Sequence, residues 1–346
     1  MALQKAIVIT DANQASLVRD RPRPALRDDY ILVKTAAVAL NPTDWKHIDN
    51  NLSTPGALVG CDYAGVVVEV GKAVKKPFRA GDRICGFVHG SNAVQHEDGA
   101  FADYIVAKGD LQMRVPEGMG FEEAATLGLG VTTAAQGLYQ GLKLRLPTES
   151  GGQSEETILI YGGSTATGTL AIQFAKMSGY RVLTTCSAAN FDLVKSRGAD
   201  EIFDYRNPGS AAAIREATKN GLKLIFDTVS SGSSTGYCEQ AMSTAGGAYS
   251  ALLPVGIDRA NIESRATMAY TAFGEDFTFG PRAIGAKPED REFAERIAGI
   301  VEKTLAEGKL QVHPPELCSG GLEGVLDGLQ RMREGKVSGT KLVYKI

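Results

Sequence analysis

The sequence predicts an α/β protein in which a β-rich domain accompanies a doubly wound parallel sheet. The first observation is a strand, a Gly-rich turn, a helix and a second strand, which follow one another within residues 157–186. The second is the N-terminal third, where Pro, Gly and Asp rather than helices separate short apolar runs. The third is a last strand over 341–345, in a C-terminal piece that resembles the first domain more than the second. We therefore expect the chain to return to the β-rich domain, so that the other domain is an insertion.

The β-rich region is interpreted as a small distorted barrel. Its short strands alternate with turn signals such as Asp98-Gly99. Strands are expected over residues 1–10, 30–34, 64–70 and 102–106. From Phe121 the pattern becomes helical and continues as a longer helix over 132–142, and the polar segment 147–153 is expected to be an exposed loop.

Residues 162–168 form the central motif of the sequence. The almost unbroken apolar run 157–161 precedes them, and an amphipathic helix over 169–177 follows. Unpaired N–H groups at the start of a helix attract phosphate, and small residues let the backbone approach it. The spacing is not a clean G-x-G-x-x-G, because Thr165 and Ala166 stand where two glycines could be. A plain strand-to-helix turn is the alternative, but the strands that follow favour a dinucleotide site.

The α/β rhythm continues beyond this motif. Strands are expected over 181–186, 201–203, 222–227 and 247–253, and helices over 191–197, 211–219 and 237–242. Residues 266–280 lack a strong period, and helices over 289–306 and 322–333 precede the last strand.

The end of the second strand of the insertion indicates which dinucleotide binds. An NAD site usually has Asp or Glu there for the ribose 2′-hydroxyl, whereas residues 186–190 contain no carboxylate. Lys195, Arg197 and Tyr205 follow and could donate hydrogen bonds to a 2′-phosphate. Ser187 could equally be a helix cap and Lys195 a solvated charge. The missing acid predicts NADPH.

Composition excludes several classes of function. The chain has 346 residues and a net charge of −3 without a basic block, which disfavours nucleic acid or an anionic membrane as partner. No apolar run is long enough for a membrane span. The five cysteines are odd in number and scattered, which argues for a reducing compartment and makes the cytoplasm the expected location.

Lys46 is the strongest candidate for chemistry in the first domain. In the motif Asn41-Pro-Thr-Asp-Trp-Lys46, Pro42 and Asp44 favour a short rigid element that presents the lysine. The alternative is an ordinary surface lysine.

These motifs resemble those of the medium-chain dehydrogenases/reductases over nearly the whole chain. The matching motifs are Asn41-Pro-Thr-Asp44, Gly60-Cys-Asp-Tyr-Ala-Gly-Val66, Val70-Gly71, Ala80-Gly-Asp-Arg83, Gly99-Ala-Phe-Ala102 and Ala124-Ala-Thr-Leu127. A narrower resemblance is to the trans-acting enoyl reductases of fungal highly reducing polyketide synthases. It rests on Tyr161-Gly-Gly-Ser-Thr-Ala-Thr167, Thr185-Cys-Ser187, Asn190-Phe-Asp-Leu193, Lys195-Ser-Arg-Gly-Ala199 and Phe203-Asp-Tyr-Arg206.

The resemblance implies a GroES-like catalytic domain over 1–135 and 285–346 and a Rossmann NADPH-binding domain over 136–284. It implies a monomer that reduces the α,β-double bond of a polyketide thioester on the acyl carrier domain of such a synthase, or of a hybrid synthase. Such a reduction needs no metal.

The resemblance also implies roles for individual residues, with Lys46 and Thr133 as catalytic candidates. The cofactor residues are Thr43, Asp44, Trp45, Lys46, Ser164, Thr165, Ala166, Thr167, Ser187, Ala188, Ala189, Asn190, Lys195, Tyr205, Leu252, Leu253, Val337 and Ser338. The substrate residues are Thr133, Ala134, Ala135, Gln136, Gly137, Leu138, Tyr139, Gln140, Ala269, Tyr270, Thr271, Ala272 and Phe273. Leu253, Ala269 and Tyr270 depart from the family pattern, so the substrate can differ.

Zinc is not expected, although alcohol dehydrogenases share this superfamily. Pro42-Thr43 and Cys61-Asp62 stand where the zinc-dependent members carry ligands, and the four histidines do not pair at ligand spacing.

Two other functions stay open. One is a free-standing zinc-independent NADPH quinone or alkenal reductase, which a Gly-Gly pair in place of Ser-Thr-Ala-Thr would favour. The other is a non-catalytic NADPH-binding protein, which Lys46 and Thr133 beside an intact cofactor site argue against.

Overall fold

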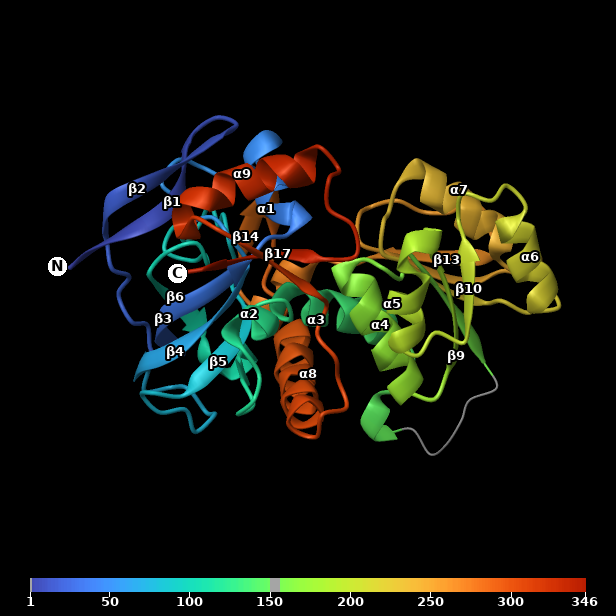
Figure 1. The fold of residues 1–346 in the computed structure, drawn as a ribbon, viewed down its shortest axis with the longest axis horizontal. Helices are drawn as coiled ribbons and strands as arrows, with labels where there is room; N and C mark the ends of the chain where they lie inside the picture. The colour runs from blue at the N-terminus through green and yellow to red at the C-terminus, as the bar shows by residue number, and fades with distance from the viewer. Residues whose placement is uncertain (1, 150–155) are drawn as a thin grey trace. The chain divides into compact units, whose positions relative to one another are not determined.

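The computed structural model describes residues 2–149 and 156–346, which form two compact units (Figure 1). Unit 1 comprises Met1–Leu129 and Tyr270–Ile346, and unit 2 comprises Gly130–Ala269. The fold class is therefore confirmed: a β-rich unit accompanies a unit built on a parallel sheet. The domain boundaries given above, at residues 135/136 and 284/285, stay a prediction.

Unit 2 contains a six-stranded parallel sheet in the order β10-β9-β8-β11-β12-β13. Its strands are β8 (Thr157–Tyr161), β9 (Arg181–Cys186), β10 (Glu201–Asp204), β11 (Leu224–Asp227), β12 (Gly247–Ala251) and β13 (Ile262–Ala266). The strand order reverses direction between β8 and β11. In doubly wound sheets, ligands bind at the carboxyl ends of the strands beside such a switch point.

Helices link the strands of unit 2 from β8 to β12, as Figure 1 shows. They are α4 (Ala166–Met177), α5 (Phe191–Ser196), α6 (Ser210–Ala217) and α7 (Gly232–Ala241). Helix α3 (Gly128–Ala135), which begins in unit 1, precedes β8. Ile158, Leu159 and Ile160 of β8 are fully buried, because a central parallel strand is covered on both faces.

Unit 1 is built on a seven-stranded sheet in the order β16-β17-β3-β4-β5-β7, with β6 paired to β3. These strands are β3 (Tyr30–Ala39), β4 (Asp62–Val70), β5 (Arg83–Phe87), β6 (Tyr104–Lys108), β7 (Met113–Arg114), β16 (Pro315–Cys318) and β17 (Lys341–Lys345). Because β17 pairs antiparallel with β3, the last strand of the chain lies in one sheet with strands from its N-terminal third.

Smaller elements complete unit 1. Strands β1 (Leu3–Asp11) and β2 (Gln14–Pro22) form a hairpin, as do β14 (Phe277–Phe279) and β15 (Arg282–Ile284). The helices are α1 (Pro42–Asp49), α2 (Phe121–Ala124), α8 (Pro288–Ala306) and α9 (Gly321–Arg333).

Several element boundaries differ from the sequence expectation. The helix expected over 132–142 is α3 followed by a π-helical segment, Gln136–Gly141. Helix α7 begins five residues early, because Ser231 accepts the N–H of Ser234 and caps it. Strand β6 lies two residues later than expected, and β2, β5, β7, β13, β14, β15 and β16 were not expected. The loop 147–153 begins with a short 3-10 turn, Pro147–Glu149, and residues 150–153 lie outside the described part.

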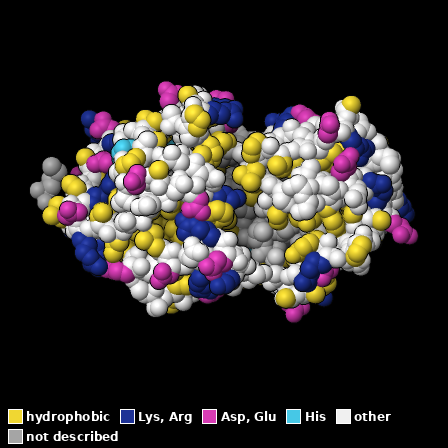
Figure 2. Space-filling model, turned by 90° about the horizontal axis from the view of Figure 1, so that it is seen from above, with side chains coloured by type: hydrophobic (Ala, Val, Ile, Leu, Met, Phe, Trp, Pro, Cys, Tyr) yellow, Lys and Arg dark blue, Asp and Glu magenta, His cyan; other side chains and the backbone are white. Residues whose placement is uncertain are grey.

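Acidic and basic side chains are intermixed on the visible face of each unit (Figure 2). None of the described helices is both long and apolar enough to cross a bilayer.

Candidate active and cofactor sites

The turn after β8 is shaped for a close approach of its backbone. Gly162 has φ +79°, which L side chains rarely adopt. A Cβ atom on Gly163 would lie 2.0 Å from Thr184 Oγ1, and one on Gly168 would lie 2.3 Å from the Gly162 carbonyl oxygen. Side chains are therefore excluded where the turn packs on β9 and α4.

Hydrogen bonds of threonine hydroxyls stabilise this turn. Thr228 Oγ1 lies 2.8 Å from the carbonyl oxygen of Tyr161 and 2.9 Å from that of Gly162. Thr185 Oγ1 accepts the N–H of Gly162 at 3.0 Å, and Thr165 Oγ1 accepts that of Gly168 at 2.9 Å. Sequence reasoning missed Thr185 and Thr228; hydroxyls at the ends of two strands were the available signal.

The turn fits the pyrophosphate of a dinucleotide. Helix α4 begins at Ala166, three residues earlier than expected, so Ala166 and Thr167 occupy its first turn. The N–H groups in the first turn of a helix have no carbonyl partner within the helix, so they can bind phosphate. Ser164 and Thr165 lie beside them and are partly exposed.

The segment expected to hold the 2′-phosphate follows β9. Residues Ala188–Asn190 form a 3-10 turn, in which Ala188 and Ala189 are exposed. Asn190 donates to Ser187 Oγ at 3.3 Å. Lys195, on α5, and Tyr205, after β10, are both exposed.

A carboxylate that sequence reasoning missed lies on the neighbouring strand. Asp204, the last residue of β10, pairs in register with Cys186, the last residue of β9. Arg206 donates to Asp204 through Nε and Nη2. The end of β9 itself has no acid, as expected, but an acid–base pair lies beside it.

A buried carboxylate organises the turn after β11. Asp227 Oδ1 accepts the N–H groups of Val229 and Ser230 at 2.9 Å each, and Oδ2 accepts the hydroxyls of Ser234 and Tyr249. Ser230 Oγ in turn accepts the N–H of Leu252 at 2.7 Å. The loop of the predicted cofactor residues Leu252 and Leu253 is thereby tied to this turn.

The predicted substrate residues of unit 2 lie on α3 and the π-helical segment. Thr133 is buried, with 8% of its surface exposed, and Ala134, Ala135, Gln136 and Leu138 are also buried. Within the unit, Gly137 packs on Phe226, where a Cβ atom would lie 2.2 Å away. Tyr139 donates to the carbonyl oxygen of Phe174 at 3.3 Å. The Gln140 carbonyl accepts from Arg265 at 3.2 Å, and Ala269 is the last residue of unit 2.

Helix α1 of unit 1 carries the other set of predicted cofactor residues. Asp44 Oδ2 accepts the N–H of Asn41 at 2.7 Å and completes a capping box. Burial raises the pKa of Asp44 to about 7. Burial also lowers the pKa of Lys46, whose Nζ lies 5.6 Å from the centre of the Trp45 ring.

The 3-10 turn Ala269–Phe273 places most of its predicted substrate residues in the interior of unit 1. Tyr270, Thr271, Ala272 and Phe273 are all buried. The Tyr270 hydroxyl lies 2.9 Å from Thr43 Oγ1 and 3.6 Å from Cys61 Sγ. Of the two remaining cofactor candidates, Val337 packs against the core of unit 1 and Ser338 is exposed.

The position of Cys61 and Asp62 does not fit zinc. The Asp62 carboxylate is fully buried and accepts from Lys341, from Asn41 at 2.9 Å and from the N–H of Leu129. Within residues 2–149 and 156–346, no group of three or more His, Cys, Asp and Glu side chains could hold a metal ion. The metal-free site stays a prediction.

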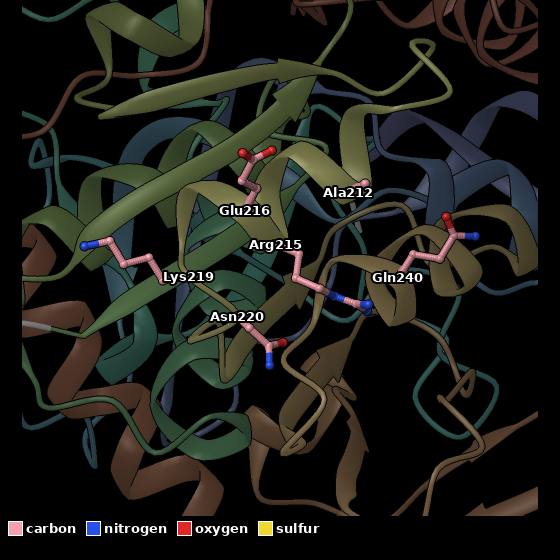
Figure 3. Close-up of a pocket in the computed structure, with 6 residues that line it drawn as sticks. All are labelled: Ala212, Arg215, Glu216, Lys219, Asn220 and Gln240. Carbon is pink, nitrogen blue, oxygen red and sulfur yellow. The ribbon is translucent and has the colours of Figure 1, made fainter.

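A pocket of about 530 Å³ lies elsewhere in unit 2 (Figure 3). Its lining comes from α6, the turn after it and α7: Ala212, Arg215, Glu216, Lys219, Asn220 and Gln240. It contains none of the predicted site residues.

Two family models match the chain. The alcohol dehydrogenase GroES-like domain matches residues 27–117, and the zinc-binding dehydrogenase domain matches residues 166–252. Trans-enoyl reductase TOXD of Cochliobolus carbonum is 62% identical over 278 residues, which are 80% of this chain and 93% of the relative. Trans-enoyl reductase resD of Aspergillus sclerotiorum is 47% identical over 357 residues, which are 99% and 100% of the two chains.

Solved structures share the fold over the whole chain. They include a quinone oxidoreductase from Coxiella burnetii (TM-score 0.73, 22% identity, 100% of both chains) and the CurK enoyl reductase (0.76, 19%, 99% of both). A mycobacterial protein complexed with NADPH has a TM-score of 0.75 at 19% identity and covers 99% of this chain and 100% of its own.

Fold and phosphate loop together define an oxidoreductase of the medium-chain dehydrogenase/reductase class, which uses a nicotinamide cofactor. Within that class, the chain belongs to the trans-enoyl reductases. The resemblance that the sequence motifs indicated is confirmed.

Proposed function

We propose that the protein is a trans-acting enoyl reductase that uses NADPH to reduce the α,β-double bond of a polyketide thioester in secondary-metabolite biosynthesis. The substrate is carried on the acyl carrier domain of a highly reducing polyketide synthase or hybrid synthase. The observation that carries the proposal is the turn 162–168, folded as a phosphate cradle in a chain that belongs to the trans-enoyl reductases. We further propose a location in the cytoplasm, because all five cysteines are free. The monomer is proposed on the resemblance to the trans-acting enoyl reductases alone.

NADPH is favoured over NADH by two observations. The end of β9 carries no carboxylate that would repel a 2′-phosphate. A structural neighbour was solved in complex with NADPH.

Three groups of residues would hold the cofactor, which supplies a hydride when bound. Ser164, Thr165, Ala166 and Thr167 would bind the pyrophosphate. Ser187, Ala188, Ala189, Asn190, Lys195 and Tyr205 would bind the 2′-phosphate end. Thr43, Asp44, Trp45, Lys46, Leu252, Leu253, Val337 and Ser338 would border the nicotinamide.

Lys46 and Thr133 would then handle charge and proton. Negative charge develops on the thioester carbonyl oxygen during the reduction, and the Thr133 hydroxyl would donate a hydrogen bond to it. Lys46 Nζ would give a proton to the α-carbon. Since burial lowers the pKa of Lys46, its ammonium group is a better acid than that of a solvated lysine. Thr133 to Gln140 and Ala269 to Phe273 would border the acyl chain.

The substrate class can be tested by comparing NADPH oxidation with a crotonyl thioester of pantetheine and with simple quinones. We expect the thioester to react faster. Lys46→Met is expected to slow thioester reduction about 100-fold or more. Lys34→Met, which removes an exposed lysine of β3 in the same unit, should leave the rate unchanged.

Equal or faster turnover of quinones would contradict the proposal and favour the quinone reductase. Absence of turnover with both substrates, in protein that binds NADPH, would favour a non-catalytic binding protein.

A further inference from the structure

Asp204 and Arg206 form a forked ion pair at the carboxyl edge of the parallel sheet. Arg206 Nε lies 3.1 Å from Oδ1 and Nη2 lies 3.1 Å from Oδ2 of Asp204. The N–H of Arg206 also donates to Oδ1 at 3.0 Å. The pair remains open to solvent, since 56% of the Arg206 side chain and 27% of the Asp204 side chain are exposed.

This pair lies beside the segment that would receive the 2′-phosphate. Asp204 is in register with Cys186, so it lies at the same edge of the sheet as Ser187, the residue that follows β9. Arg206, together with the backbone N–H groups of Arg206 and Ala188, lowers the pKa of Asp204 and keeps it ionised. By strand register, this carboxylate lies next to the start of the 187–190 turn.

An uncovered carboxylate at this place would favour the wrong cofactor. Asp or Glu near the ribose accepts a hydrogen bond from the 2′-hydroxyl of NADH and repels a 2′-phosphate. Arg206 offsets part of that repulsion by pairing with the acid. Its Nη1 has no hydrogen-bond partner among the described residues, so the guanidinium can bind a phosphate while still paired with Asp204.

We propose that Arg206, held by Asp204, is the cation that selects a 2′-phosphorylated cofactor. The inference rests on the proposed use of NADPH and adds the residues that decide the choice. Asp204 orients the guanidinium at the cost of some repulsion, and Arg206 supplies the charge. Asn190 and Ser187 contribute neutral donors to the same turn.

Binding of two cofactor fragments to the full chain tests the proposal without any turnover. Adenosine 2′,5′-bisphosphate and AMP differ only in the 2′-phosphate, and calorimetry gives both dissociation constants. For Arg206→Gln we expect bisphosphate binding to weaken about tenfold or more, with AMP changed less than about twofold. For Asp204→Asn we expect bisphosphate binding to tighten by about twofold or more, because repulsion is lost. The double variant Asp204→Asn with Arg206→Gln should bind the bisphosphate more tightly than Arg206→Gln alone does.

Arg181→Gln is the matched control. Arg181 pairs with Glu201 at the amino ends of the same two strands, far along the sheet from the phosphate turn. This variant should bind both fragments as the unaltered protein does. Thermal unfolding of each variant checks the fold.

The outcomes separate the two proposals. If the unaltered protein binds the bisphosphate no better than AMP, selection of NADPH fails and this inference fails with it. If the unaltered protein prefers the bisphosphate and Arg206→Gln keeps that preference, NADPH use stands and the role of Arg206 is overturned. Weakening of both fragments to the same degree would overturn it as well.

Discussion

His89 is a neutral side chain held inside the aromatic core of unit 1. Only 5% of its surface is exposed, and its ring stacks on Tyr270 with the centroids 4.2 Å apart. Asn92 Nδ2 lies 3.3 Å from its Nδ1. Burial, and to a smaller degree nearby His47, lowers the pKa of His89 to about 3.

This burial predicts a loss of stability in acid. Below about pH 6.5 the unfolded chain binds a proton at His89 that the folded protein does not bind, so the free energy of unfolding falls as the pH falls toward 3. Between pH 7.5 and 5 the loss from this group should be about 2 kcal/mol. In His89→Phe, which keeps an aromatic ring against Tyr270 and Phe273, this loss disappears. Urea unfolding of both proteins at each pH measures it.

The comparison of the two proteins removes other titrations from the result. Burial raises the pKa of Asp44 to about 7, which acts in the opposite direction over the same pH range. Asp44 is present in both proteins and cancels in the difference. A constant difference in unfolding free energy from pH 7.5 to 5 would contradict the prediction.

Residue roles could be predicted only in part from the sequence. Functional roles for Lys46, Asp44 and the 162–168 turn could be predicted from the residue types and their spacing. The position of Tyr270 inside unit 1, with its hydroxyl on Thr43, could not be read, because residues 43 and 270 are brought together only by the fold. The pairing of Asp204 with Cys186 likewise depends on strand register.

Among the elements, the phosphate turn depends on small residues for its shape. Gly163→Ala would place a Cβ atom 2.0 Å from Thr184 Oγ1, which is buried and donates to the Ile160 carbonyl. The turn must then move away from β9. We expect a loss of about 1–3 kcal/mol in stability and weaker NADPH binding, measured by urea unfolding and calorimetry.

Two further variants show whether crowding is the cause. Gly163→Ala with Thr184→Ala should be more stable than Gly163→Ala alone, because the second change removes Thr184 Oγ1, the atom that the new Cβ would approach most closely. Gly236→Ala, in α7, meets nothing within 4 Å and should be neutral or stabilising by up to about 1 kcal/mol. If the double variant is no more stable than Gly163→Ala, crowding against Thr184 is not the cause.

Element type was predictable where the pattern was long or strongly apolar. The bounds of β8, β9 and β17 agree with the sequence, because these strands are apolar runs between clear turn signals. Strand β13 was missed because Glu263 and Arg265 interrupt its apolar character. As an edge strand, it can leave Glu263 exposed and Arg265 half-buried. Strand β16 is four residues long and begins with a proline, which masks its signal.

At the scale of the molecule, unit 1 is closed by an ion pair between distant parts of the chain. Lys341, in the last strand, is 3% exposed and donates to Asp62, to Asn41 Oδ1 at 3.0 Å and to the Thr126 carbonyl. Three separate segments of unit 1 therefore meet at one buried ammonium group. The return of the chain was predictable from β17, but the salt bridge that secures it was not.

Lys341→Met should destabilise the protein by about 3–5 kcal/mol, because the Asp62 carboxylate stays buried without its cation. Adding Asp62→Asn removes that charge, and the double variant should recover much of the loss. Lys345→Met is the matched control: Lys345 lies on the same strand and pairs with Glu122 at the surface, so its loss should cost less than about 1 kcal/mol. Urea unfolding measures all three. If the double variant is as unstable as Lys341→Met, the cost comes from lost packing of the lysine stem and not from an unpaired charge, and the ion pair is not what closes unit 1.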